Sequence, residues 1–505
     1  MAQRRRRKAK AGTEPAAARE YELIVVARSG ATLIAAGGRR RNADTGARAL
    51  ERLLERHGAT LAPLFGPSVA RLARAAGALG GPMTRFHRVR VPGEDPGRLA
   101  ELAARLRSLP AVAGAYVKPP GEPAALRRVV LPRPAAAPPL TPDFSARQGY
   151  LERAPGGIDA RFAWRRPGGD GAGVSIVDVE GDFRFTHEDL LEGQGGLVAG
   201  SPPDSVSLRN HGTAVLGVIG GDRNGHGVTG IAPAAHQRGV ALGGLGSALA
   251  IRTAADLLAP GDLLLVEFHR PGPRFGFVPG PNLQGYIAIE WWPDDQLAIQ
   301  YATGRGVIVL EVAGNGAEDL DDPLYDVPGP GFPPGWANPF RRVLDPGAIL
   351  VGAGAPPPGT HGRSHGPDRS RLIFSNFGAC LDVQGWGVEV TTCGYGDLQG
   401  GPDEDLWYTD QFLGTSSATA VVTGALAATQ GALKAAEKPL LTPARARELL
   451  RATGSPQQDA NHRPATQRIG NRPDLRRIFF HLGIAKRVRP AGEGARPAAR
   501  RAPRA

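Results

Sequence analysis

This chain has few cysteines and no long apolar run, and both observations limit the class of protein to which it can belong. Only Cys380 and Cys393 occur among the 505 residues, too few for a disulfide framework or a cysteine-based zinc site. They lie near neighbouring predicted strands, so one bridge and two buried thiols stay equal alternatives. No apolar run reaches the roughly 18 residues of a membrane helix, which predicts no membrane span.

A secretory signal is also missing. The basic N-terminus is not followed at once by an apolar stretch of about 7–15 residues, the length found in signal peptides. A cytoplasmic location and a non-standard export route both stay open on this evidence. The compartment is therefore not assigned from the sequence.

Positive charge is present in excess, but it is confined to the two ends. The net charge is +13, and residues 1–12 carry six positive charges and no negative ones. Residues 486–505 carry seven positive charges and one glutamate, so the two ends hold twelve of the thirteen. We expect residues 1–18 and 486–505 to be disordered basic tails with weak affinity for polyanions. The body between them is nearly neutral.

The first part of the chain predicts a small α+β domain over residues 19–118. Apolar or alternating runs predict strands, and Ala- and Leu-rich segments with helical spacing predict helices. Asp95 is a suitable N-cap for one helix, with Pro96 at its first position. The expected strands are 21–27, 86–91 and 111–119, and the expected helices are 45–56, 67–79 and 95–110.

A proline-rich segment separates this domain from a larger one. Residues 119–143 hold eight prolines, which predicts an extended, exposed linker. Residues 144–485 then alternate apolar strands with helices, a pattern typical of a parallel sheet covered on both faces. The strands are expected at 173–179, 263–268, 306–314 and 347–355, and two of the helices at 213–221 and 248–259. The fold class is therefore α/β, with a doubly wound, mostly parallel sheet.

Four residues with complementary chemistry follow strands or begin helices in the large domain. Asp178 ends a strand, His211 precedes a helix, Asn315 follows a strand, and Ser416 begins an apolar helix. Each has an ordinary structural explanation, as a cap, a turn or a core residue. Together they supply a nucleophile, a base, a carboxylate to orient the base, and an amide to bind an oxyanion. The set predicts hydrolysis by an activated serine.

The motifs around these residues resemble those of subtilisin-like serine proteases, the subtilases. The matching segments are VSIVDVEGDFRFTHEDL, NHGTAVLGVI, VTGIAP, VAGNG and GTSSATA, in the order of that family. The resemblance implies a triad of Asp178, His211 and Ser416, with Asn315 in the oxyanion hole and Ser417 as a neighbour of the nucleophile. It also implies that residues 19–118 are a ferredoxin-like propeptide domain that assists folding and blocks the cleft, as in a zymogen. Most members of the family are secreted.

The sequence departs from the family pattern at two places that bear on the site. The segment between Asp178 and His187 is two residues longer than usual, which leaves Asp182 as a competitor for the carboxylate role. Glu267 replaces the serine of the usual Ser-Leu-Gly-Gly edge, ahead of a Pro- and Gly-rich excursion at 269–292. This excursion is either a surface insertion or a reshaped specificity cleft. In the second case the substrate-binding residues are Glu267, Gly314, Glu290 and Trp291.

No cofactor or obligatory metal is expected. Residues 318–326 cluster five acids, which suits calcium, but a solvated acidic loop is the preferred interpretation. The predicted function is a monomeric serine endopeptidase acting on proteins or peptides through an acyl-enzyme. The alternatives are a catalytically silent peptide-binding scaffold and a polyanion-binding protein acting through its tails.

Overall fold

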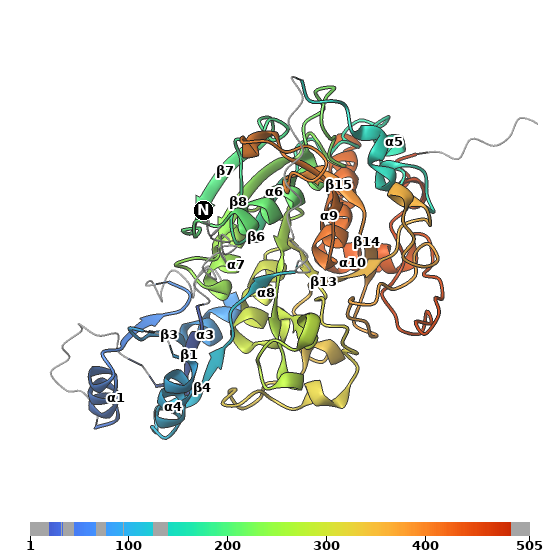
Figure 1. Ribbon diagram of the computed structural model, residues 1–505. Coiled ribbons are helices and arrows are strands. Elements are labelled where there is room, and N and C mark those ends of the chain that lie inside the picture. The colour runs from blue at the N-terminus through green and yellow to red at the C-terminus, as the bar shows by residue number, and fades with distance from the viewer. Residues whose placement is uncertain are drawn as a thin grey trace, which may run out of the picture.

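The computed structural model describes residues 20–31, 33, 45–66, 77–93, 95–124 and 140–485. Both predicted tails and residues 125–139 of the predicted linker lie outside these ranges. The described chain forms a small N-terminal domain, seen in blue in Figure 1, and a larger body that runs from green to red. Within these ranges, no helix combines the length and the apolar character needed to cross a membrane.

The body is built on a seven-stranded sheet with the order β14-β13-β12-β9-β6-β8-β7. Each neighbouring pair in this sheet is parallel. This confirms the predicted fold class, since parallel strands need crossover connections such as helices. The strands are β6 (Ser175–Glu180), β7 (Gln194–Ala199), β8 (His236–Ala241), β9 (Leu263–Val266), β12 (Ile308–Val312), β13 (Ile349–Gly354) and β14 (Val383–Trp386).

Helices cover both faces of this sheet because alternate strand residues point to opposite sides. On one face, Ile176 and Leu265 pack in a core that includes α6 (Val206–Gly220) and α9 (Thr415–Ala435). On the other face, Val177, Leu264 and Val266 share a second core with the other crossover helices. These are α7 (Ser247–Asp256) and α8 (Pro293–Gly304). The remaining helices of the body are α5 (Ala160–Ala163), α10 (Pro443–Ala452) and α11 (Leu475–His481).

The N-terminal domain is a four-stranded antiparallel sheet, in the order β2-β3-β1-β4, with helices packed on it. Asp95 accepts a hydrogen bond from the backbone N–H of Arg98 and so caps α4 as predicted. Most of the helix predicted at 67–79 lies outside the described residues. The elements are β1 (Glu22–Ala27), α1 (Thr45–Arg56), β2 (Thr60–Pro63), α3 (Gly80–Thr84), β3 (Phe86–Arg90), α4 (Pro96–Arg107) and β4 (Val112–Lys118).

The start of the predicted linker is not an exposed connection. Residues 119–124 are buried or half-buried, and they include strand β5 (Glu122–Pro123). This strand pairs antiparallel with β10 (Phe268–Pro271), which also pairs with β11 (Tyr286–Ala288). The ends of the 269–292 excursion are therefore buried in a sheet, and exposed positions are confined to its tip. Proline did not prevent strand formation because Pro123 lies on the edge strand.

The other short elements lie in the connections of the body, apart from one 3₁₀ turn in the N-terminal domain. Strands β15 (Val390–Cys393) and β16 (Tyr408–Phe412) form an antiparallel pair. Cys380 and Cys393 are both buried free thiols, which decides between the two alternatives for the cysteines. The 3₁₀ turns are Gly77–Leu79, Ser145–Arg147, Gly149–Leu151, Pro273–Phe275, Pro281–Leu283, Ile289–Trp291, Pro323–Asp326, Pro339–Arg341, Thr360–Gly362 and Glu404–Leu406.

Candidate active site

Ser416 is the second residue of helix α9 and is fully buried. The next hydroxyl, that of Ser417, donates to the carbonyl oxygens of Trp386 and Gly414, both at 3.0 Å, so it is held by the backbone. The Ser416 hydroxyl makes no hydrogen bond of ordinary geometry within the described residues. It nevertheless lies close to the Glu267 carboxyl, where it partly opposes a rise in the pKa of that group that burial causes. Of the two neighbouring serines, only Ser416 has a hydroxyl free for chemistry.

His211 lies in α6 and presents one ring nitrogen to a carboxylate. Its Nδ1 is 2.7 Å from Oε2 of Glu180, and Nε2 has no partner among the described residues. A carboxylate at Nδ1 favours the tautomer that carries the proton there. The Nε2 lone pair is then free to accept a proton, which is the arrangement that a general base requires.

The carboxylate beside His211 is Glu180, and this corrects the expectation for Asp178. Residues 178 and 180 point to the same side of β6 because strand side chains alternate. Only Glu180 lies at the end of the strand and hydrogen bonds with the imidazole. The Asp178 carboxyl is fully buried and has no hydrogen-bond partner in the described chain.

The sequence did contain a signal for this exchange. The segment before His187 is two residues too long when it is counted from Asp178, and counting from Glu180 removes the excess. Asp182, the predicted competitor, has other partners among the described residues. It accepts a hydrogen bond from the N–H of Phe183 and lies 3.7 Å from Arg209.

Asn315 links the start of α9 to a peptide carbonyl from the N-terminal segment. Its Oδ1 accepts hydrogen bonds from the backbone N–H and the hydroxyl of Thr415, both at 2.9 Å. Its Nδ2 donates to the carbonyl oxygen of Ala124 at 2.5 Å. The preceding residue, Gly314, has φ +101, and a Cβ there would lie 2.7 Å from Nδ2 of Asn376. Glycine therefore allows the turn that positions Asn315.

The segment that ends at Ala124 lies in the cleft as an added strand. Phe268 pairs with Pro123 and His269 pairs with Glu122. The N–H of Ala124 donates to the carbonyl oxygen of Glu267 at 3.2 Å. A Cβ on Gly414 would lie 2.2 Å from the Ala124 oxygen, so glycine is needed beside Ser416 for this carbonyl to fit. This is β-strand addition of a peptide to an exposed edge, a common mode of peptide recognition.

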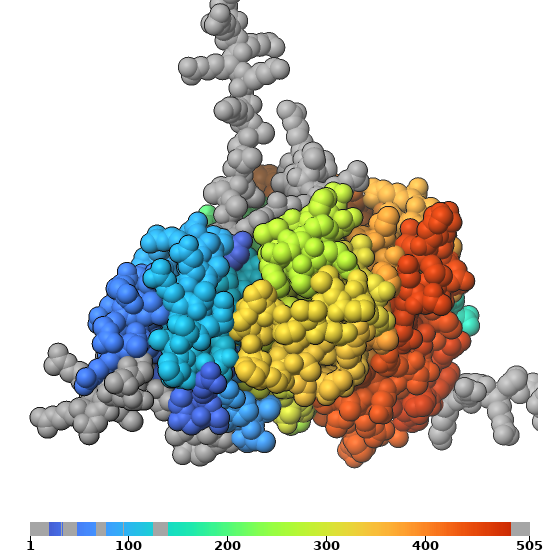
Figure 2. Space-filling model, turned by 90° about the horizontal axis from the view of Figure 1, so that it is seen from below, coloured from blue at the N-terminus to red at the C-terminus, as the bar shows by residue number. Residues whose placement is uncertain are grey.

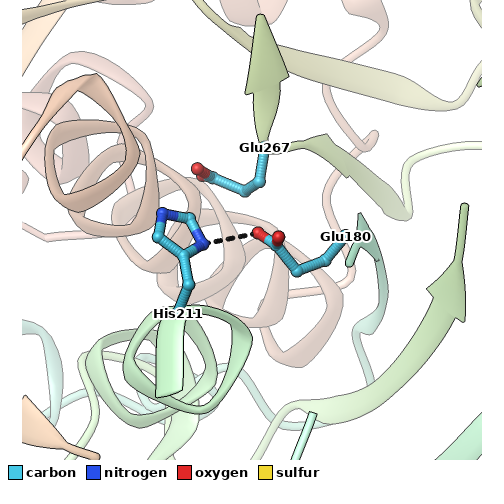
Figure 3. A group of neighbouring side chains, drawn as sticks. All are labelled: Glu180, His211 and Glu267. Atoms are coloured by element: carbon cyan, nitrogen blue, oxygen red, sulfur yellow. Dashed lines mark hydrogen bonds and ion pairs between the residues drawn. The ribbon is translucent and has the colours of Figure 1, made fainter. Parts of the chain in front are cut away.

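Figure 3 shows two buried carboxyl groups beside His211, and a third, that of Asp178, lies near both of them. Glu267 follows β9 and points toward the imidazole, and Glu180 approaches the ring from β6. Burial and the neighbouring charge of Glu180 raise the pKa of Asp178 well above its ordinary value. Burial, followed by the charges of Asp178 and Glu180, does the same to Glu267. The site therefore has a strongly acidic composition.

Glu267 thus lies beside Ser416 and His211, whereas two other predicted substrate-binding residues lie elsewhere. Burial raises the pKa of Glu290 to about 8, and the nearby charges are those of Arg342, Asp345, Arg447 and Asp382. Trp291 is fully buried, and its indole N–H donates to the carbonyl of Tyr325. Both residues are buried in the support of the sheet, with partners other than Ser416 and His211.

The acidic loop after Asn315 is neutralised by arginines. Arg274 forms ion pairs with Glu318 and Asp322, both at 2.5 Å. Arg341 forms ion pairs with Asp321 at 3.7 Å and with Asp326 at 2.8 Å. These four carboxylates are thereby paired with cations supplied by the chain.

Comparison with solved structures identifies the fold. Fervidolysin from Fervidobacterium pennivorans, described as a keratinolytic enzyme related to subtilisin, matches with a TM-score of 0.51 and 17% identity. The match covers 91% of this chain, which spans 61% of the length of fervidolysin. A protease from Pseudoalteromonas arctica and the PatG macrocyclase each match over 68% of this chain, with TM-scores of 0.46 and identities of 19% and 17%. They are covered over 99% of their lengths.

The chain has the subtilisin-like fold. No family model matches the sequence, and no curated protein matches it either. The structural likeness therefore identifies the architecture, and the chemistry has to be argued from the site itself.

Proposed function

We propose that this protein is a serine endopeptidase with a triad of Glu180, His211 and Ser416. The observation that carries the proposal is the carbonyl of Ala124. It accepts a hydrogen bond from the Asn315 amide beside the start of α9, where the buried Ser416 lies. A peptide carbonyl is thus held next to a serine, with an amide donor at its oxygen. This is the arrangement that acyl transfer requires.

The proposed reaction uses each group in turn. His211 Nε2 takes the proton of Ser416 as Oγ attacks the carbonyl carbon of the substrate, and Glu180 stabilises the resulting imidazolium. Asn315 and a backbone N–H at the start of α9 stabilise the oxyanion. The imidazolium then protonates the leaving amine, and water hydrolyses the acyl-enzyme with His211 again as the base. No step needs a cofactor.

A fluorophosphonate probe tests for an activated serine. We expect the wild-type protein to gain the mass of one probe less HF, and to react faster after limited proteolysis removes residues before the body. The N-terminal segment covers the cleft, which is the reason for the expected acceleration. Intact mass spectrometry gives the result.

Ser417→Ala is the matched control for this experiment, because its hydroxyl only bonds the backbone. It should label like the wild type, whereas Ser416→Ala should not label. Absence of labelling in the wild type, before and after proteolysis, would favour the silent peptide-binding scaffold. If Ser417→Ala loses labelling and Ser416→Ala keeps it, the nucleophile is Ser417 and the proposed assignment is wrong.

We further propose that the N-terminal domain is an intramolecular inhibitor. Strand β5 lies on the edge β10, and Ala124 lies at the candidate oxyanion site, so a substrate cannot enter in the same way. Figure 2 shows the N-terminal domain packed against the body. At this contact the rings of Tyr116 and Phe332 meet edge to face, with centroids 4.9 Å apart.

A buried charge network joins the two domains. Lys118 Nζ lies 2.5 Å from Asp294, 3.1 Å from Asp295 and 3.4 Å from Glu22. Arg270 lies 3.0 Å from Glu22 and adds a second cation. Lys118, Asp294 and Asp295 are fully buried. Each partner that is removed from such a network leaves an uncompensated buried charge.

Lys118→Met is therefore expected to destabilise the joined domains. Loss of one partner of a buried ion pair costs about 3–5 kcal/mol. Thermal unfolding of the full chain should show this loss near neutral pH. Burial would raise the pKa of Glu22, but Lys118 and Arg270 lower it to about 2. The Glu22 contribution is therefore present above pH 4.5 and is lost as the pH falls toward 2.

Lys438→Met serves as the control, since Lys438 is exposed. A surface substitution of this kind changes stability by about 0.5 kcal/mol or less. Equal effects of the two substitutions would show that the buried network does not hold the domains together. A mutational effect of Lys118→Met that persists unchanged at pH 2 would contradict the role given to Glu22.

The remaining expectations extend this proposal. We propose proteins or peptides as substrates, and a monomeric enzyme. Polyanion binding by the tails, a separate candidate activity, concerns residues 1–18 and 486–505, outside the described ranges. It would show a linear fall of the logarithm of affinity with the logarithm of salt concentration.

A further inference from the structure

The acidic group around His211 differs from the other buried charges of this protein. Asp178, Glu180 and Glu267 have no exposed surface. Within the described ranges, none of the three forms an ion pair with a lysine or arginine, and His211 is the only basic partner, at Glu180. At the domain contact, by contrast, Lys118 pairs with Glu22, Asp294 and Asp295, and Arg270 pairs with Glu22 and Asp295. Burying several carboxylates without cations is costly.

The geometry of this group suits a single ion. One ligand atom from each of Glu180, His211 and Glu267 lies within 4.8 Å of the other two. Figure 3 shows the Glu267 carboxyl pointing toward the imidazole, with Glu180 also beside the ring. Both oxygens of Glu267 and Nε2 of His211 lack hydrogen-bond partners among the described residues. Glu267 and His211 thus supply unpartnered buried acceptors, whereas the Glu180 oxygens already bond His211 Nδ1 and the N–H of Gly181. A bound ion would replace the Glu180–His211 hydrogen bond.

We propose that Glu180, His211 and Glu267 bind a divalent transition-metal ion, with Zn²⁺ the best match, and that this ion inhibits the enzyme. Zinc accepts imidazole nitrogen together with carboxylate oxygen, and three protein ligands leave a fourth position for water. Calcium and magnesium prefer oxygen ligands alone. The inhibitory effect rests on the proposed peptidase function, whereas binding of the ion does not depend on it.

Competition for the imidazole explains the inhibitory effect. A ring nitrogen that coordinates the metal through its lone pair cannot accept the proton of Ser416. The positive charge of the metal also stabilises the ionised forms of the buried carboxylates, and this favours binding of the ion. Removal of the ion by a chelator restores the free base. No covalent or redox step is involved.

Calorimetric titration of the full-length Ser416→Ala protein with ZnCl₂ measures this binding without any need for activity. We expect one site, and we expect Glu267→Gln on the same background to weaken the affinity at least tenfold, since even outer-shell changes cost about 10–100-fold. His211→Asn is the second variant and should also weaken binding. Circular dichroism spectra check that each variant is folded.

Glu389→Gln is the matched control. Glu389 also contacts two histidines, His361 at 3.4 Å and His365 at 2.8 Å, but Arg363 already supplies a cation at 2.9 Å. Its zinc affinity should equal that of the parent. Zinc should also slow fluorophosphonate labelling of the wild type, and EDTA should reverse this.

The outcomes separate the two proposals. Absence of zinc binding, or binding unaffected by both Glu267→Gln and His211→Asn, would overturn the metal site whatever the labelling shows. Loss of binding in Glu389→Gln alone would place the zinc at the other histidine group and would also overturn it. Zinc binding with the expected variant pattern, in a protein that never labels, would support the metal site while rejecting the peptidase.

Discussion

Replacing Ser416 by alanine is expected to leave a chain of 505 residues intact, whereas the wild-type chain is cut after Ala124. The carbonyl of Ala124 is the one that Asn315 binds beside Ser416, so the bond to the next residue in the sequence, Ala125, is the one presented for attack. Loss of the nucleophile lowers peptide hydrolysis by roughly 10⁶-fold. Intact mass spectrometry of freshly purified protein shows whether two fragments or one chain are present.

The site of the cut makes this prediction specific. Ser417→Ala should be processed like the wild type. Wild-type protein that stays uncut, but labels with the fluorophosphonate, would show an active serine that does not process its own N-terminal segment. Cutting that persists in Ser416→Ala would point to another protease or another nucleophile.

The second large effect is expected at Glu180. Glu180→Gln should lower kcat by about 10⁴-fold, by analogy with removal of the carboxylate in other serine triads. The amide cannot stabilise the imidazolium and can hold the wrong tautomer of His211. KM should change little, because the peptide is bound by the β10 edge and by Asn315. Steady-state kinetics on a peptide substrate measures both constants.

Asp178→Asn is the matched control, two residues earlier on the same strand. Its carboxyl makes no hydrogen bond with His211, so we expect a reduction in kcat of less than about tenfold, against about 10⁴-fold for loss of the triad carboxylate. If Asp178→Asn costs more than Glu180→Gln, the assignment made from the sequence motif is correct and the contact seen at Glu180 is not the catalytic one.

The proposed inhibition by the N-terminal domain would have two parts. The cleft is occupied by β5 through backbone pairing, and the domain that carries it is held by the Lys118 network, which includes body residues Asp294 and Asp295. Cutting after Ala124 would break the chain but would leave that network in place. Release of the N-terminal domain would then require two events, the cut after Ala124 and the separation of Lys118 from its buried acidic partners.

Several functional features were readable from the sequence because each depends on local order along the chain. Apolar strands alternating with helices predicted the doubly wound sheet, since a parallel sheet needs crossovers on its faces. Ser416 and Asn315 could be singled out because a helix start and a turn after a strand mark the carboxyl edge of such a sheet. His211 was singled out by its chemistry and motif, although it lies inside α6 and does not precede that helix as predicted. The N-terminal elements followed from their periodicity and from the cap at Asp95.

The tertiary structure decided what depends on distance between segments far apart in the chain. Asp178 and Glu180 share a strand face, and only the placement of α6 shows which of them reaches His211. Glu290 and Trp291 resembled cleft residues because of their position in the sequence, but packing places them in the support of the sheet. The six residues before Ala125 looked like a linker because of their prolines, but part of this segment pairs as strand β5 with the edge of β10. Residue order therefore determined the sheet and its chemical groups, including the choice of Ser416, and side-chain packing determined which carboxylate and which carbonyl meet at the site.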